Sequence, residues 1–131
     1  MKKREFLKSA AALSSLAILP SSVWAAIQND RLRTAHIGVG GKGGANVKSN
    51  SSHKGVDVSA LCEVDDNRMA AAKKLHPNAK VFTDYRKLFD EIGSGIDAVV
   101  VSTPDHTHAP ASLTAMKMGK PVYCQKPLTH H

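Results

Sequence analysis

The sequence predicts an α/β fold with a doubly wound parallel sheet, on the basis of three observations. Short apolar segments alternate with segments of helical periodicity from about Leu32 onward. A glycine-rich turn follows the first apolar segment, and Gly38, Gly40 and Gly43 have the spacing G-x-G-x-x-G. An acid, Glu63, lies 20 residues after Gly43, at the end of the second apolar segment. This arrangement is typical of a βαβ unit that holds the pyrophosphate of a dinucleotide.

The glycines of this turn meet separate physical demands. Gly38 permits a tight turn from strand to helix, Gly40 lets the backbone approach phosphates, and Gly43 allows the helix to pack close to the strand. The N-terminus of the following helix offers free N–H groups and a partial positive charge to an anion. We expect Gly41 and Lys42, inside the turn, to belong to the same phosphate site.

Five strands joined by helices are expected in chain order. The strands are residues 32–38, Val56–Cys62, 81–82, Ala98–Val101 and Val122–Cys124. The helices run from the glycines to about Ser51, over Asp66–Leu75 after an Asp65 cap, from an Asp84 cap through Glu91, and from near Pro110 to Gly119 and Pro121.

The expected strand order is 3-2-1-4-5. The unbroken apolar run Ala98–Val101 fits an interior parallel strand that is covered on both faces. The usual dinucleotide-binding sheet has the order 3-2-1-4-5-6, so the sheet looks incomplete after its fifth strand. We therefore interpret residues 26–131 as an incomplete dinucleotide-binding domain.

Some side chains are expected to be buried without a chemical role. Cys62 and Cys124 end strands two and five, which would place them roughly 14 Å apart at ~4.8 Å per strand. That distance is too long for a disulfide, so both are expected to be reduced and at least partly buried. Leu113, Met116 and Met118 are expected to pack on the last helix.

Composition excludes some partners. The chain has 131 residues, enough for one domain, and a formal net charge of +7, of which +3 comes from residues 1–25. Lysine and arginine are scattered along the sequence, and the chain has only one Trp, two Tyr and three Phe. This pattern argues against a nucleic-acid partner.

Residues 1–25 are expected to be an export signal, which makes the protein periplasmic. A basic start at Lys2, Lys3 and Arg4 precedes a mostly apolar stretch over residues 10–19, and small residues at 23 and 25 suit cleavage after Ala25. The stretch is shorter than the roughly 20 residues that span a bilayer, so no stable membrane anchor is expected after cleavage. The alternative is an amphipathic N-terminal helix that stays on the protein.

The export route is left open by one residue. Residues 3–8 resemble the twin-arginine pattern R-R-x-F-L-K, with Lys3 in place of the first arginine, so general secretion is an alternative. Dinucleotides are made in the cytosol, which favours export of a folded protein with its cofactor bound. No cysteine follows the apolar stretch, so a lipoprotein anchor is not indicated.

Two further motifs carry a resemblance to a known family. A T-P-x-x-x-H loop occupies residues 103–108, and the triplet Gln125-Lys126-Pro127 follows the fifth strand. With the glycine motif and Glu63, they make the chain from about Leu32 to Thr129 similar to the N-terminal domain of the Gfo/Idh/MocA oxidoreductases. The resemblance implies NAD or NADP at the carboxyl ends of the strands, and hydride transfer at a carbon of a sugar, cyclitol or related polyol.

The same resemblance implies roles for individual residues. Ser102, Thr103 and Pro104 would lie beside the nicotinamide, and His108 near the cofactor on the substrate side. Lys126 would lie close to the nicotinamide and the reacting hydroxyl, as a catalytic group. Gln125 stands where the family usually has Glu, which removes a carboxylate partner from Lys126. The family's second domain, with its D-x-x-x-H motif, is absent from this sequence.

Cofactor choice depends on Glu63. Its carboxylate is expected to bind the ribose diol and to repel a 2′-phosphate, which favours NAD, while Arg68 and Lys42 keep NADP open. His106 and His108 form an H-x-H pair with only Asp105 nearby, so no metal is expected.

Three functions follow from these observations. The first is the N-terminal part of an exported NAD(P)-dependent oxidoreductase that acts on a sugar-like small molecule, with an oligomer open for the full-length form. The second is net glycoside hydrolysis by transient oxidation, with a cofactor that is never released. The third is a non-catalytic dinucleotide-binding remnant, whose exposed sheet edge would favour self-association.

Overall fold

The computed structural model describes residues 31–128 of the chain. The strands are β1 (Leu32–Ile37), β2 (Val56–Cys62), β3 (Lys80–Phe82), β4 (Ala98–Val101) and β5 (Val122–Cys124). The helices are α3 (Lys42–Ser51), α4 (Asp66–Leu75), α5 (Tyr85–Ile92) and α6 (His108–Lys117). The export segment expected at residues 1–25 lies outside the described residues.

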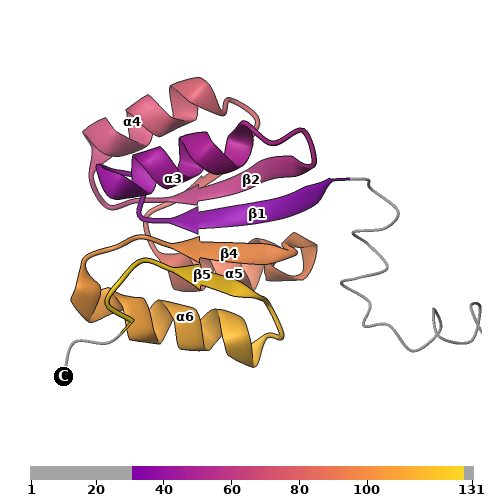
Figure 1. Ribbon diagram of the computed structural model, residues 1–131, viewed down its shortest axis with the longest axis vertical. Coiled ribbons are helices and arrows are strands. Elements are labelled where there is room, and N and C mark those ends of the chain that lie inside the picture. The colour runs from indigo at the N-terminus through magenta and orange to yellow at the C-terminus, as the bar shows by residue number, and fades with distance from the viewer. Residues whose placement is uncertain (1–30, 129–131) are drawn as a thin grey trace, which may run out of the picture.

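All five strands form one parallel sheet in the order β3-β2-β1-β4-β5, which confirms the predicted order. Helices α3 and α4 cover one face of the sheet, and α5 and α6 cover the other (Figure 1). The change of face falls between β1 and β4, which are neighbours in the sheet although three α-helices and two strands separate them in sequence. That is the switch point at which doubly wound sheets bind ligands.

The helix starts follow from capping side chains. Asp65 accepts hydrogen bonds from the backbone nitrogens of Asn67 and Arg68 at the start of α4, and Asp84 accepts one from Arg86 at the start of α5. Both caps were predicted. β1 ends one residue before the prediction because Gly38 has φ +83°, which leaves the extended region.

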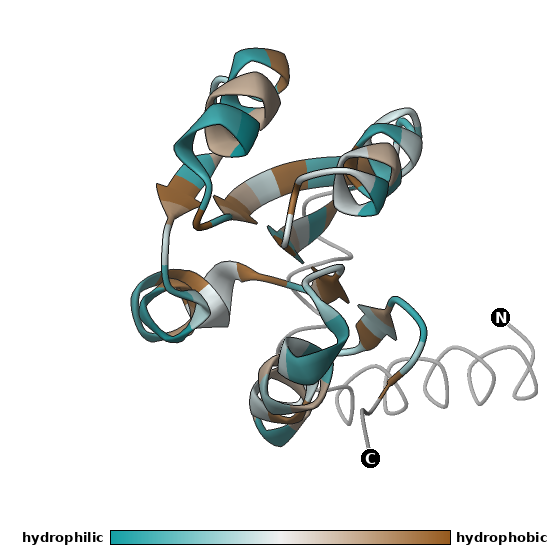
Figure 2. Cartoon of the chain, turned by 90° about the vertical axis from the view of Figure 1, so that its left-hand side faces the viewer, coloured by the Kyte–Doolittle hydropathy of each residue, from teal (hydrophilic) through white to brown (hydrophobic). Residues whose placement is uncertain are grey.

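Each face of the sheet carries its own apolar core (Figure 2). Leu88, Phe89, Ala111 and Ala115 bring α5 and α6 onto one face, against strand residues such as Val99. On the other face Val47 of α3 and Ala72 of α4 pack with Leu61 of β2. β4 is buried between these layers from its second residue onward, as its apolar run predicted.

The prediction for the last helix was wrong in part. Leu113 and Met116 are each 50% exposed, and Met118 is 41% exposed. The reason is that α6 packs its small residues, Ala111 and Ala115, against the sheet, which turns the larger side chains outward. Cys62 is buried and Cys124 half-buried, both as free thiols. No helix among residues 31–128 is long and apolar enough to cross a membrane.

Candidate functional site

A cavity of about 600 Å³ opens at the carboxyl ends of the strands. Its walls come from the turns after β1, β2, β3 and β4, so residues far apart in sequence meet there because the strands are parallel. Six of the predicted site residues line it, namely Gly38, Gly40, Glu63, Ser102, Thr103 and Pro104. Gly41, Lys42, Gly43, His108 and Lys126 do not line it.

Two glycines of the turn are required by close approach. A Cβ on Gly38 would lie 2.7 Å from backbone atoms of Ser102 and Thr103, and the residue has φ +83°. A Cβ on Gly43 would overlap the carbonyl oxygen of Gly38, which is the close packing of helix on strand that the motif predicts. The turn therefore brings the start of α3 against the ends of β1 and β4.

The N-terminus of α3 differs from those of α4 and α5. No side chain caps it, and no acid lies in its first turn. Gly41 is the cap residue, with open space where a Cβ would be, and Lys42 is exposed at the first helical position. Among the described residues, the N–H groups of Gly41 and Lys42 donate no hydrogen bond, and a phosphate group fits at this positive end of the helix dipole.

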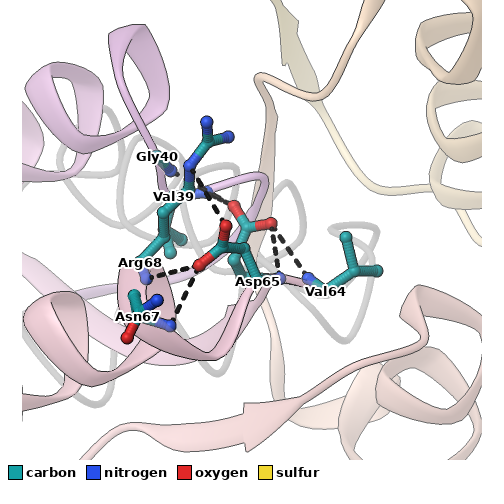
Figure 3. Close-up of polar contacts among 7 residues, drawn as sticks. Val39, Gly40, Val64, Asp65, Asn67 and Arg68 are labelled. Atoms are coloured by element: carbon teal, nitrogen blue, oxygen red, sulfur yellow. Dashed lines mark hydrogen bonds and ion pairs between the residues drawn. The ribbon is translucent and has the colours of Figure 1, made fainter.

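Glu63 fastens the glycine turn to the end of β2, and its backbone partners are among the residues labelled in Figure 3. Its Oε2 accepts hydrogen bonds from the nitrogens of Val39 at 3.1 Å and Gly40 at 3.2 Å. Its Oε1 accepts from Val64 at 2.9 Å and Asp65 at 3.2 Å. This structural role was not predicted, because spacing alone does not show where a carboxylate points. The expected contact with a ribose diol stays a prediction, made by the same cavity-lining carboxylate.

Arg68 covers Gly40. A Cβ on Gly40 would overlap Cδ of Arg68, so the guanidinium arm lies above the turn at the place predicted for phosphate. The arm is held loosely, with Nε 3.8 Å from Oδ2 of Asp65, and its side chain is 61% exposed. It is therefore an exposed cation at the Glu63 end of the cavity, which is where a 2′-phosphate would be placed.

The two histidines of the T-P-x-x-x-H loop lie in different environments. His106 lines the cavity and its side chain is 75% exposed, whereas His108 is 2% exposed and lies outside the lining. The Nε2 atom of His108 is 2.6 Å from the carbonyl oxygen of Thr103, and Nδ1 is 2.5 Å from that of Pro127. This geometry favours a positioning role for His108 over the predicted cofactor contact. His106 lines the cavity although the sequence analysis assigned it no site role, and the same holds for Thr83, Tyr85 and Arg86.

The Thr103 hydroxyl is a second sign of an incomplete site. Its Oγ1 is buried and has no hydrogen-bond partner in the described structure. Buried hydroxyls are normally paired, so a polar atom of a bound ligand would complete this one. Thr103 borders the cavity at the end of β4, where the family resemblance implies the nicotinamide.

Lys126 lies just beyond the sheet. Gln125 continues the ladder by donating its N–H to the carbonyl of Val101 at 2.8 Å, and Lys126 follows as an exposed residue. The residue therefore stands beside the end of β4, at the same edge of the sheet as the cavity. Its predicted catalytic role is not tested by this geometry.

Other reactive groups offer less. Within residues 31–128, no three His, Cys, Asp or Glu side chains are grouped in a way that could hold a metal ion. Cys62 lines the cavity, but burial raises the pKa of its thiol to about 12, assisted by the charges of Asp84 and Glu63. Such a thiol is a poor nucleophile. The charged and polar side chains that line the cavity are therefore better suited to binding a charged ligand than to nucleophilic chemistry.

The doubly wound sheet, the uncapped helix at its switch point and the acid at the end of β2 define a dinucleotide-binding domain. The sequence profile of the Gfo/Idh/MocA family, described as an oxidoreductase family with an NAD-binding Rossmann fold, matches residues 32–131. The chain belongs to this family.

Individual relatives share the same region. The inositol 2-dehydrogenase of Corynebacterium glutamicum (strain R) is 35% identical over 75% of this chain and 29% of its own length. A glycosyl hydrolase family 109 protein of Stenotrophomonas maltophilia is 31% identical over 95% of this chain and 29% of its own. The crystal structure of an Agrobacterium radiobacter oxidoreductase in complex with NAD+, L-tartaric acid and magnesium has a TM-score of 0.69 at 25% identity, over 76% of this chain and 28% of that one. The chain spans less than a third of the length of these relatives.

Proposed function

We propose that this chain is the cofactor-binding part of an exported, NAD-dependent oxidoreductase that acts on a hydroxyl carbon of a sugar, cyclitol or related polyol. The observation that carries the proposal is the junction of Glu63 with the glycine turn. It brings a cavity-lining carboxylate next to a glycine turn that leads into an uncapped helix N-terminus. A ligand with phosphates and a diol suits this pairing, because the helix N-terminus attracts an anion and the carboxylate accepts hydrogen bonds from hydroxyls.

Different residues would bind different parts of the cofactor. The N–H groups at Gly41 and Lys42 would hold the pyrophosphate, and Glu63 would accept hydrogen bonds from the ribose diol. A carboxylate repels a 2′-phosphate, so NAD is favoured. NADP binding would require Arg68 to swing from above Gly40 and offset the charge of Glu63.

Substrate chemistry would take place at the other end of the cavity, near Thr103 and Pro104. Bound NAD supplies a hydride acceptor at its nicotinamide ring. The ammonium of Lys126 would stabilise negative charge on the reacting oxygen. His106 presents an exposed imidazole to the same cavity, within 4.0 Å of Asp105, and would contact the substrate side.

A second function is supported by the comparison with the family 109 glycosyl hydrolase. That alignment covers 95% of this chain, so it includes most of the first 30 residues, whereas the inositol dehydrogenase alignment covers 75%. Net glycoside hydrolysis by transient oxidation suits an exported protein, because its cofactor would never be released.

One experiment separates these functions. The protein is expressed from its complete reading frame, purified, and denatured to release bound nucleotide for mass spectrometry. It is then assayed with cyclitols, with free sugars and with aryl glycosides, each with and without added NAD. Reduction of added NAD by a cyclitol or sugar supports the dehydrogenase. Glycoside cleavage that needs no added NAD, together with co-purified nucleotide, supports the hydrolase, and activity in no assay contradicts both.

We also propose that residues 1–25 export the protein to the periplasm by the twin-arginine route. The proposal is supported by the basic start, the apolar stretch and the small residues before position 26. A fusion of residues 1–30 to a folded fluorescent protein should reach the periplasm in cells with a working twin-arginine translocase. Arg4→Gln should hold the fusion in the cytoplasm, whereas export from cells that lack the translocase would indicate general secretion.

A further inference from the structure

The β4–α6 loop and the turn after β5 leave neighbouring strands at the same edge of the sheet as the cavity. β4 and β5 pair up to Val101 and Cys124, and the last ladder bond runs from the N–H of Gln125 to Val101. Beyond that bond, no backbone hydrogen bond among the described residues joins the β4–α6 loop to the turn after β5. Beyond the ladder, a hydrogen bond between these two segments therefore has to involve a side chain.

The side chain of His108 occupies this gap. One ring nitrogen is 2.6 Å from the carbonyl oxygen of Thr103, and the other is 2.5 Å from that of Pro127. The residue is 2% exposed and is the first of α6, so its backbone is fixed by the helix. A histidine ring is rigid and carries hydrogen-bonding nitrogens on two sides, which lets one side chain reach both loops. It donates to one carbonyl when neutral and to both when doubly protonated.

We propose that His108 is a positioning residue that ties the β4–α6 loop to the Lys126-Pro127 turn and thereby fixes Lys126 relative to Thr103. The catalytic consequence depends on the function proposed above, whereas the tie between the loops does not. Lys126 directly precedes Pro127, so holding the carbonyl of Pro127 restricts where the ammonium can reach. His108 itself has no contact with the cavity and acts through the two loops.

The test compares two substitutions with a control. His108→Leu keeps an apolar side chain of moderate size and removes both hydrogen bonds. His108→Gln supplies one amide nitrogen, which can donate to one of the two carbonyl oxygens and so replaces part of the contact. His53→Ala is the matched control, since His53 is exposed between α3 and β2, at the opposite edge of the sheet from the cavity.

The first readout is hydrogen exchange followed by mass spectrometry on the full-length protein. In His108→Leu, peptides covering residues 102–108 and 122–128 should exchange faster, while peptides from β1 and β2 keep their protection. His108→Gln should restore part of that local protection, and His53→Ala should leave both segments unchanged. Equal loss of protection across the sheet would show that His108 is an ordinary core residue and would overturn the proposal.

The second readout is steady-state kinetics with whichever substrate the full-length enzyme turns over. His108→Leu should lower kcat by about 10- to 100-fold through misplacement of Lys126, with the KM for NAD changed by less than about threefold. His108→Gln should recover much of kcat. A wild-type protein that binds no NAD would refute the proposed function and leave the exchange test valid. Unchanged exchange and kcat in His108→Leu would refute the tie and leave the proposed function standing.

Discussion

The carboxylate of Glu63 lies 3.2 Å from the backbone nitrogen of Gly40 and joins the end of β2 to the glycine turn. This contact links two parts of the motif that sequence comparison treats as separate, the glycines and the distant acid. It also means that a change at Glu63 acts on the shape of the turn as well as on any ribose contact. Contacts at Gly43, Asp97 and His36 likewise lead to measurable effects on stability.

Glu63→Gln should weaken NAD binding by about 10- to 100-fold, which corresponds to about 1.5 to 3 kcal/mol for a hydrogen bond to a charged group. The amide keeps one acceptor oxygen, so it cannot serve both Gly40 and Val64 in the way the carboxylate does. Isothermal titration calorimetry measures the change. Glu91→Gln, at an exposed site on α5, is the control and should bind as the wild type does. Equal affinity for the two variants would show that Glu63 has no part in the site.

Gly43→Ala should destabilise the fold, because its Cβ would overlap the backbone carbonyl of Gly38 and neither backbone can move without shifting β1 or α3. Overpacking of this kind costs about 1 to 3 kcal/mol. Urea denaturation should show a lower midpoint than wild type. Gly55→Ala meets nothing within 4 Å and is the matched control. The packing argument fails if both variants unfold at the same urea concentration.

Asp97→Asn should destabilise the sheet at the amino ends of β1 and β4, opposite the cavity. Both carboxylate oxygens of Asp97 bind Arg33, through its backbone nitrogen at 2.9 Å and its guanidinium at 2.9 and 3.0 Å, and Asp97 is 3% exposed. Burial opposes ionisation, but the hydrogen bonds and charge of Arg33, with the charge of Lys120, still hold the pKa of Asp97 below its usual value.

Loss of this carboxylate leaves the Arg33 guanidinium without its ion-pair partner. Because the Arg33 side chain is 26% exposed, we expect a cost of about 1.5 to 3 kcal/mol, the range for a hydrogen bond to a charged group. Asp90→Asn, on the exposed face of α5, is the control for charge removal and should be nearly neutral. Thermal unfolding followed by circular dichroism compares the two. A small change in Asp97→Asn, similar to that of the control, would mean that the ion pair contributes nothing to β1–β4 pairing.

His36 should make stability depend on pH. Burial in β1, together with the charge of His76, lowers the pKa of His36 from 6.5 to about 4. The folded state then binds fewer protons than the unfolded state, so stability is fully present above about pH 6.5 and falls as the pH drops toward 4. The difference of the two pKa values corresponds to about 3 kcal/mol.

The measurement is the free energy of unfolding in urea between pH 7.5 and 4.5, for wild type and His36→Met. Carboxylates titrate in both proteins, so the difference between the two curves isolates His36. That difference should shift in favour of His36→Met as the pH falls. Parallel curves would contradict the burial-induced pKa shift.

The strands and helix caps could be predicted because they depend on local pattern, and the strand order because the glycine motif indicates a fold with a known order. Asp65 and Asp84 stand directly before apolar-periodic segments, and the run Ala98–Val101 has the composition of a strand covered on both faces. Leu113 and Met116 could not be placed correctly, since a helix with small residues on one side and large ones on the other can pack either way.

The side-chain contacts within the site could not be predicted from the sequence. The direction of the Glu63 carboxylate and the arm of Arg68 above Gly40 depend on side-chain rotamers in the folded turn. The burial of His108 follows from where α6 begins, and its second partner, Pro127, lies 19 residues further along the chain. Two histidines in one H-x-H motif therefore have opposite environments, which the motif alone does not reveal.

The central claim is that the cavity at the glycine turn binds NAD. Calorimetric titration of NAD into the wild-type protein and into Gly40→Val tests it most directly, with circular dichroism to confirm folding and Gly55→Val as the matched control. We expect wild type and the control to bind, and Gly40→Val to lose more than about a hundredfold in affinity, because a branched side chain would fill the phosphate space. Absence of binding by the wild type, or equal affinity in Gly40→Val, would contradict the account.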